Sequence, residues 1–451
     1  MSGTGTKTDE NRAPTEGLTA FDRALAPAVE AYAARHPNSR ALHEGARAFM
    51  PGGNTRSALY WEPFPLYVAH SRGCRLCDQD GHDYLDALGD FTAGLYGHSD
   101  PVIANAVSQV VAGGFARGAP GTGEIDLAQL LCERFPGIER VRFCNSGTEA
   151  TLYAISLARI ATGRGKLLCF SGAYHGGVFG FPPGGNPMNA PYDWTQATYN
   201  DAAGALDVIR GLGDDLAAVV VEPMLSNGGC IPARADFLKA LRTGCDEVGA
   251  LLIFDEIVTS RMGAGGLQAL LGVRPDLTTL GKYIGAGFAF GAFGGRADVM
   301  DLMSPERPDG LVHAGTFNNN AYSTTVGAAA LRQVFTPERA QRLLADGEAL
   351  RDRLNAWARE IAPAAQFTGV GSAMNIHFCR GEIRSPQDLA REPRSLLRLF
   401  HYDLLEQGVY AAVRGQLNLS LPMGDRDFAV IETAVMASLT RRAALIEVLT
   451  P

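Results

Sequence analysis

Two stretches of the sequence decide the fold: Ala250-Leu251-Leu252-Ile253-Phe254-Asp255-Glu256 and Leu277-Thr278-Thr279-Leu280-Gly281-Lys282. In each stretch, a short and largely apolar run is followed by charged residues. Such a run is typical of a strand that is buried on both faces of a parallel sheet. Ligands of open α/β sheets bind outside the carboxyl ends of the strands, which is where these charged residues are expected to lie.

Similar runs occur before and after these two stretches. They are Val141–Cys144, Lys166–Phe170, Ala217–Val221 and Phe290–Gly294. Segments with helical periodicity, such as Gly147–Thr162 and Asp236–Val248, separate the runs. This alternation predicts an α/β domain with a mostly parallel, doubly wound sheet.

The pattern changes after Thr336. A long charged amphipathic helix is expected over Glu338–Glu360, followed by short strands and closing helices, which indicates a smaller α+β domain. The segment Phe21–Met50 also has a helical pattern and is expected to pack with that domain. We therefore predict four parts: a disordered leader (1–17), an N-terminal segment that packs with the small domain (18–75), a large domain (76–335) and a small C-terminal domain (336–451).

Composition excludes several classes of function. Among 451 residues, 40 are basic and 48 are acidic, and no run of Lys or Arg occurs, so we expect neither nucleic acid nor a membrane surface as a partner. The first residues lack the pattern of a signal peptide, and the longest apolar stretch, Tyr283–Gly295, is too short to span a bilayer. Eight scattered cysteines suit reduced thiols in the cytoplasm. Cys74 and Cys77 form a CxxC without a second pair, so we expect no metal site.

The residues that follow the predicted strands suggest one kind of chemistry. After Val141–Cys144, Ser146, Gly147 and Thr148 begin a helix whose free N–H groups could bind a phosphate. Lys282 stands alone among apolar and glycine residues, where desolvation favours the neutral, nucleophilic amine that forms Schiff bases.

Two further positions are compatible with a planar cofactor ring. Asp255 could keep a pyridinium nitrogen protonated, and Tyr174, which lies between glycines, could stack on the ring. Taken singly, each feature has a structural explanation: a helix cap, a surface lysine, an ion pair or a packing aromatic. Their order along one sheet favours a site for pyridoxal 5′-phosphate (PLP).

At this point the sequence resembles the class III aminotransferases of PLP fold type I, from about Ala48 to Pro422. The resemblance implies that Lys282 forms the Schiff base and shuttles a proton, that Asp255 pairs with the pyridine nitrogen, and that Ile257 packs on the ring face opposite Tyr174. It implies a homodimer in which Thr316 reaches the phosphate from the partner subunit. The motifs that carry it are Asn145–Ala150 with Ser146, Gly147 and Thr148, Tyr174–Gly176 with His175, Glu222-Pro223, Asp255-Glu256, Thr279–Lys282 and Gly315–Asn318.

Within this family the chain is most similar to the β-phenylalanine aminotransferases of the glutamate-1-semialdehyde aminomutase branch. The similarity rests on Met50–Ser57, Phe91–His98 and Val413-Arg414-Gly415. It implies that Arg56 binds a substrate carboxylate, that Arg414 receives the carboxylate of the oxo acid, and that Phe91 lies at the substrate pocket. The implied reaction moves an amino group from a β-amino acid to 2-oxoglutarate or pyruvate. Asp90-Phe91 replaces the Glu-Tyr pair typical of those enzymes.

Other functions stay open at this stage. A glutamate-1-semialdehyde-type aminomutase, an epimerase or another class III ω-transaminase would use the same cofactor. A dinucleotide-dependent oxidoreductase is disfavoured, because no GxGxxG follows a first strand with an acidic residue in the expected place. A PLP-binding regulator would need a DNA-binding module, which neither the polar leader nor the acidic charge balance supplies.

Overall fold

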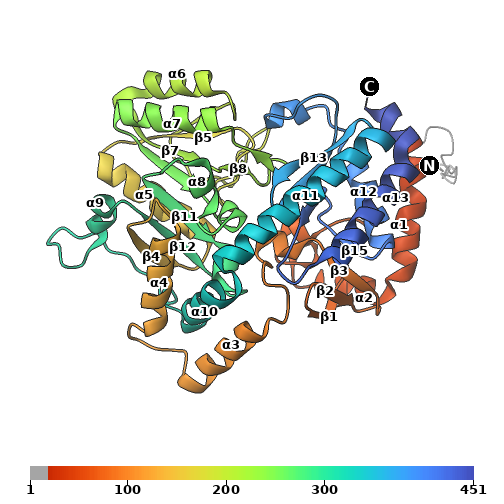
Figure 1. The fold of residues 1–451 in the computed structure, drawn as a ribbon, viewed down its shortest axis with the longest axis horizontal. Helices are drawn as coiled ribbons and strands as arrows, with labels where there is room; N and C mark the ends of the chain where they lie inside the picture. Colours follow the sequence, from red (N-terminus) through yellow and green to blue (C-terminus); the bar gives the residue numbers. More distant parts are fainter. Residues whose placement is uncertain (1–18, 451) are drawn as a thin grey trace, which may run out of the picture.

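The computed structural model describes residues 19–450, so the predicted disordered leader (1–17) lies outside the described residues. Figure 1 shows two lobes, with a large α/β lobe on the left and a smaller lobe on the right. The core of the large lobe is a seven-stranded sheet in the order β4-β12-β11-β10-β7-β5-β6. Its strands are β4 (Arg140–Cys144), β5 (Lys166–Phe170), β6 (Trp194–Ala197), β7 (Leu216–Val221), β10 (Leu251–Asp255), β11 (Leu277–Gly281) and β12 (Gly291–Gly295).

The sheet confirms the predicted mostly parallel α/β architecture, with one strand reversed. β12 pairs antiparallel with both β11 and β4, whereas the strands from β11 to β6 are parallel. β12 fits between its neighbours because it is rich in glycine. A Cβ atom on Gly291 would lie 2.1 Å from the carbonyl oxygen of Ser146.

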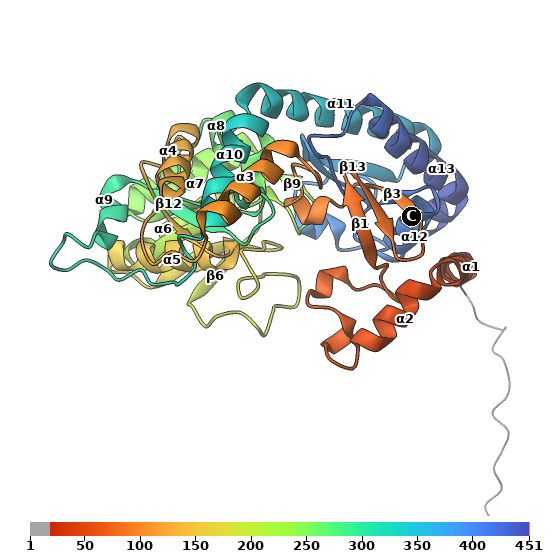
Figure 2. The same ribbon diagram turned by 90° about the horizontal axis from the view of Figure 1, so that it is seen from below.

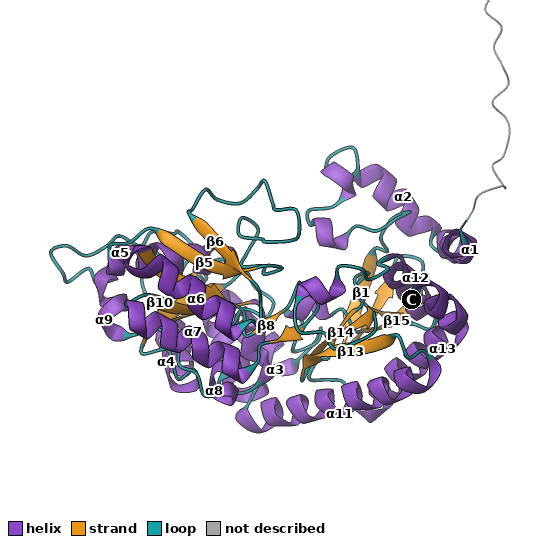
Figure 3. Cartoon of the chain, turned by 90° about the horizontal axis from the view of Figure 1, so that it is seen from above, coloured by secondary structure: helices purple, strands orange, loops and turns teal. Residues whose placement is uncertain are grey.

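Helices surround this sheet (Figure 3). α5 packs across β7, β10, β11 and β12, and α7 packs against α6, β7 and β10. The α-helices are α1 (Ala20–Arg35), α2 (Pro37–Ala46), α3 (Pro101–Gly113), α4 (Thr122–Arg134), α5 (Gly147–Thr162), α6 (Ala202–Leu212), α7 (Ala235–Val248), α8 (Gly266–Leu271), α9 (Ala297–Met300), α10 (Gly327–Ala329), α11 (Pro337–Ile361), α12 (Ser395–Glu406) and α13 (Asp425–Leu449). Within residues 19–450, no helix is both long and apolar enough to cross a membrane.

The smaller lobe contains two sheets covered by helices. One sheet has the order β1-β2-β3-β15 and the other the order β13-β14-β16. The strands are β1 (Val68–Arg72), β2 (Arg75–Asp78), β3 (Asp83–Asp86), β13 (Ala365–Val370), β14 (Ala373–Phe378), β15 (Val409–Tyr410) and β16 (Gln416–Asn418), and a separate pair is formed by β8 (Met224–Leu225) and β9 (Ile231–Pro232). α1 packs against α12, and α1 and α2 lie beside the small lobe in Figure 2.

One predicted boundary is wrong. The sequence placed residues 76–335 in the large domain, but β2 and β3 hydrogen-bond with β1, and β3 pairs in parallel with β15 of the C-terminal part. The chain therefore stays with the small lobe until Asp86. The short, charged strands β2 and β3 lack the apolar runs that marked the large sheet. The rest of the division into domains stays a prediction.

Arg261 connects the two lobes from a fully buried position. Its side chain is 1% exposed, and its guanidinium donates to Oγ of Ser372 (3.0 Å), to the carbonyl oxygen of Thr92 (2.8 Å) and to the carbonyl oxygen of Leu419. Burial lowers the pKa of Arg261 to about 10. These three partners come from segments far apart in the sequence, so one side chain fixes their relative positions.

We predict that Arg261→Met destabilises the fold by an amount on the order of 3 kcal/mol, because it leaves two buried carbonyl oxygens without donors. Urea unfolding followed by circular dichroism measures the change. Arg274→Met is the control, because Arg274 and its partner Glu139 are both exposed, and it should leave the midpoint nearly unchanged. Equal midpoints for the two variants would contradict this role of Arg261.

Candidate active site

A cavity of about 740 Å³ opens between the two lobes at the carboxyl ends of the large sheet's strands. Thirteen residues were predicted as site residues, and ten of them line this cavity. These are Arg56, Phe91, Gly147, Thr148, Tyr174, Glu222, Asp255, Ile257, Lys282 and Arg414. Of the other three, Ser146 caps the adjoining helix, His175 lies buried behind Asp255, and Thr316 is exposed elsewhere on the chain.

Neighbouring strands deliver the polar groups of the cavity. β11, β10, β7 and β5 lie side by side. Lys282 follows β11, and Asp255 is the last residue of β10. Glu222 follows β7, and the Tyr174-His175 turn comes after β5. Because parallel strands end at the same edge of a sheet, residues up to 108 positions apart (174 to 282) meet at one place.

Asp255 is a buried carboxylate with every oxygen engaged. Oδ2 accepts a hydrogen bond from Nδ1 of His175 at 2.8 Å, and Oδ1 accepts from the backbone N–H of Ile257 at 3.1 Å and from Oγ1 of Thr279 at 3.3 Å. Since a carboxylate only accepts, the proton of His175 lies on Nδ1. Asp255 therefore has a fixed orientation at the floor of the cavity.

Glu222 forms the next polar anchor. Oε1 accepts the backbone N–H of Tyr174 at 2.9 Å, and Oε2 accepts the backbone N–H (3.1 Å) and the hydroxyl (2.6 Å) of Ser226. Burial raises the pKa of Glu222, and nearby His175 opposes this effect. The carboxylate thus holds the Tyr174 turn on one side and the Ser226 turn on the other.

Lys282 follows β11 in a left-handed backbone conformation, with φ of +53°. This conformation is uncommon for a residue with a side chain. Burial, reinforced by the positive charges of Arg414 and Arg56, lowers the pKa of Lys282 to about 8, although Asp90 and Asp255 oppose the shift. A substantial fraction of the amine is therefore neutral near physiological pH.

The turn before α5 has the features of a phosphate site. Oγ of Ser146 caps α5 by accepting the backbone N–H of Glu149 at 3.1 Å, and Oγ1 of Thr148 accepts the backbone N–H of Gly177 at 3.1 Å. A Cβ atom on Gly147 would lie 2.6 Å from Cδ1 of Ile257, so a larger residue at this position would require the Ile257 side chain to shift. With an anion-binding helix start, a buried acid and a lysine of lowered pKa on one cavity, the residues fit PLP.

Two guanidinium groups contact one aromatic ring on the opposite wall. The Cζ atoms of Arg56 and Arg414 lie 5.2 Å and 5.0 Å from the centroid of the Phe91 ring. Nη1 of Arg56 also pairs with Oδ1 of Asp90 at 2.6 Å, and Nε of Arg414 donates to Oε1 of Gln416 at 3.0 Å. This wall combines two cations with an aromatic surface.

The predictions from the sequence missed several residues that line the cavity: Thr55, Ser57, Asn186, Ser226, Asn227, Val258 and Gln416. Most belong to loops without periodicity. Ser226 was detectable in principle, because it lies four residues after Glu222, which directly follows the apolar strand β7. Gln416 was also detectable, since it faces Arg414 across the tight turn at Gly415, where φ is +87°.

Comparisons with known proteins identify the family of this chain. The sequence pattern of class-III aminotransferases matches residues 58–421. The chain is 48% identical to a β-phenylalanine transaminase of Variovorax paradoxus over 95% of this chain and 98% of that protein.

Two solved structures extend the likeness. The β-phenylalanine aminotransferase structure from Variovorax paradoxus superimposes with a TM-score of 0.93 at 48% identity, covering 94% of this chain and 99% of that chain. A transaminase structure solved with PLP bound gives a TM-score of 0.83 at 33% identity, covering 91% and 99%. The predicted family and fold type are thereby confirmed: the chain belongs to the class III aminotransferases, PLP-dependent enzymes that move an amino group from an amino donor to an oxo-acid acceptor.

Proposed function

We propose that this enzyme takes the amino group from a β-amino acid resembling β-phenylalanine and gives it to an oxo acid such as 2-oxoglutarate or pyruvate. The observation that carries this proposal is the wall formed by Arg56, Phe91 and Arg414. One pocket must accept a carboxylate in each half-reaction and an aryl group in one of them. The two guanidinium groups supply a partner for the carboxylate, and the aromatic ring that both contact supplies one for the aryl group. The 48% identity to the Variovorax enzyme supports the same substrate class.

When bound, PLP withdraws electrons from the carbon that carries the amino group, so that this carbon can lose a proton. We propose that Nζ of Lys282 holds the cofactor and, once freed by the donor, moves that proton as general base and acid. Asp255, oriented by His175, would keep the ring nitrogen protonated. Its contact with Nδ1 of His175 leaves this carboxylate little freedom to turn away.

The remaining roles follow from position. Tyr174 and Ile257 both line the cavity and would pack on opposite faces of the ring. The Ser146–Thr148 turn would bind the phosphate, with Glu222 holding Tyr174 in place. Arg56 would bind the donor carboxylate, and Arg414 the carboxylate of the oxo acid.

We also propose that the enzyme is a cytoplasmic homodimer with composite sites. Thr316 does not line the cavity of its own chain within the described residues, and it lies among exposed apolar side chains, with Val312 88% and Phe317 65% exposed. Apolar side chains of this size are usually covered in an assembly. Thr316 of the partner subunit would then complete the phosphate site. The eight unpaired cysteines are compatible with the cytoplasmic location proposed here.

A panel of α-, β- and ω-amino donors, each tested with 2-oxoglutarate and with pyruvate, tests the proposed function. We expect the highest kcat/KM for aromatic β-amino acids. Lys282→Ala is the control, and it should lose both activity and the visible absorption of the protein-bound cofactor. Product formation from glutamate 1-semialdehyde without an acceptor, together with inactivity on β-amino donors, would instead identify an aminomutase.

The lowered pKa of Lys282 predicts a pH dependence of cofactor capture by the apoenzyme. The neutral amine is the reactive form, so the rate should rise as pH increases through about 8. Stopped-flow absorbance after mixing with PLP measures it. Arg414→Met removes a positive charge that lowers this pKa, so its profile should move to higher pH. Identical midpoints in the two proteins would contradict this electrostatic account.

The two arginines should separate the two half-reactions. Arg414→Met is expected to raise KM for the oxo acid by roughly tenfold to a hundredfold, the effect of losing a charge-assisted hydrogen bond, and to change KM for the donor less. Arg56→Met should show the reverse pattern. Steady-state kinetics with both substrates varied measures the two constants. Equal losses for both substrates in both variants would rule out separate roles.

A further inference from the structure

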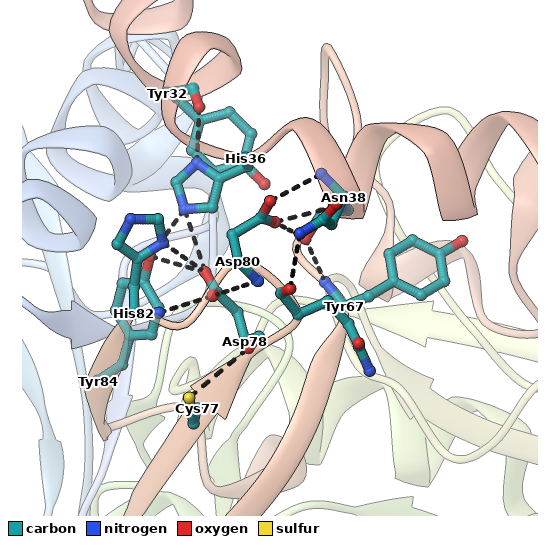
Figure 4. A network of polar contacts seen from close by, with 11 residues as sticks. Tyr32, His36, Asn38, Tyr67, Cys77, Asp78, Asp80, His82 and Tyr84 are labelled. Carbon is teal, nitrogen blue, oxygen red and sulfur yellow. Dashed lines mark hydrogen bonds and ion pairs between the residues drawn. The ribbon is translucent and has the colours of Figure 1, made fainter.

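Figure 4 shows a cluster of two histidines and one aspartate in the small lobe, and none of these three residues lines the cavity. His36 lies between α1 and α2, Asp78 ends β2, and His82 lies in the turn before β3. One ligand atom from each residue lies within 4.8 Å of the others. His36 and Asp78 are buried, whereas the side chain of His82 is 28% exposed, which leaves a route from solvent.

Two distances within the cluster match those between the ligands of a metal ion. Oδ2 of Asp78 lies 3.2 Å from Nε2 of His36 and 3.1 Å from Nδ1 of His82. Nitrogen and oxygen ligands of tetrahedral zinc lie about 2.0–2.2 Å from the ion, so they are roughly 3.3 Å from one another. The three ligand types, two imidazoles and one carboxylate, are also those that zinc uses in proteins.

The second layer of hydrogen bonds orients these atoms for a cation. Nδ1 of His36 lies 2.6 Å from the carbonyl oxygen of Tyr32, so this nitrogen carries a proton, and in the neutral imidazole Nε2 presents its lone pair. Oδ1 of Asp78 accepts the backbone N–H groups of Asp80 and His82, both at 2.9 Å, which turns Oδ2 toward the histidines. Such outer contacts are typical of metal-binding histidines and carboxylates.

The close contact between Nε2 of His36 and Oδ2 of Asp78 requires either a proton on Nε2 or a cation between the two atoms. Both atoms are acceptors when the imidazole is neutral. The hydroxyl of Tyr84 lies 2.8 Å from the first atom and 3.2 Å from the second, but its single proton can serve only one of them. The carboxylate of Asp80 does not enter the cluster, because it accepts from Asn38 and Ser39 at the start of α2.

We propose that His36, Asp78 and His82 bind one divalent transition-metal ion, with zinc as the best fit, and that a water molecule or Tyr84 occupies the fourth position. The ion would fasten the junction of α1 and α2 to the hairpin of β2 and β3. The chain continues from α2 to Arg56 and from β3 to Phe91, and both residues line the cavity. The site is therefore structural, and it does not depend on the substrate proposed above.

The experiment uses the PLP-loaded enzyme, treated with a chelator, incubated with zinc and freed of excess metal. Inductively coupled plasma mass spectrometry should then find one zinc ion per chain. His82→Gln keeps a hydrogen-bond donor next to Asp78 but loses the imidazole, so its zinc affinity should fall by at least about tenfold. Zinc should raise the thermal unfolding midpoint of the wild-type enzyme and not that of His82→Gln.

Two controls separate this site from adventitious binding. His70→Ala removes an exposed histidine from β1 of the same sheet, and Cys77→Ser removes a thiol beside Asp78; both variants should keep the zinc. Asp78→Asn should lose it. The proposal is overturned if the wild-type enzyme binds no more zinc than His82→Gln. In that case a protonated His36 would pair with Asp78 without a metal ion. The proposed aminotransferase function would stand, because it does not depend on this site.

Discussion

The site depends on one constraint, the burial of the Asp255 carboxylate at the end of an apolar strand. A buried carboxylate is stable only when its oxygens are hydrogen-bonded. Here two of the donors come from other strands of the sheet: His175 follows β5, and Thr279 belongs to β11. Satisfying Asp255 therefore brings the turn that carries Tyr174 and the strand that carries Lys282 to one point. The hydrogen bonds that the buried Asp255 carboxylate requires are therefore the same contacts that bring the cavity residues together.

A second constraint acts on the opposite wall. The backbone from Gly89 to Thr92 is left-handed, with φ of +42° at Asp90, +51° at Phe91 and +80° at Thr92. Three consecutive residues with side chains adopt this conformation only when the surroundings impose it. Arg261 binds the carbonyl oxygen of Thr92, and the side chain of Asn418 donates to the carbonyl oxygen of Leu88 at 2.7 Å. Distant segments thus fix the position of Phe91, whose ring contacts both Arg56 and Arg414.

These two constraints explain which parts of the fold and of the site could be predicted from the sequence and which could not. Lys282 and Asp255 follow apolar runs directly, so local pattern was enough to find them. β6 was not predicted from the sequence, because Trp194-Thr195-Gln196-Ala197 is an edge strand with polar residues and lacks an apolar run. The reversal of β12 was predictable, since the link from Gly281 to Gly291 is shorter than the dozen or so residues that a parallel crossover needs. The Arg56–Asp90 pair and the His36–Asp78 contact join residues 34 and 42 positions apart without a spacing motif, and they required the fold.

The electrostatics of the cavity connect its two sides. The charges that lower the pKa of Lys282, beyond burial, belong to Arg414 and Arg56, the two groups suited to bind carboxylates. In the empty cavity these charges favour the neutral amine, which is the nucleophile. A carboxylate bound to either arginine would offset its charge, and the pKa of Lys282 would then rise. In the proposed mechanism the amine would be a stronger base at the stage when it accepts a proton from the substrate. The position of Lys282 beside the two arginines therefore suits both tasks proposed for the lysine.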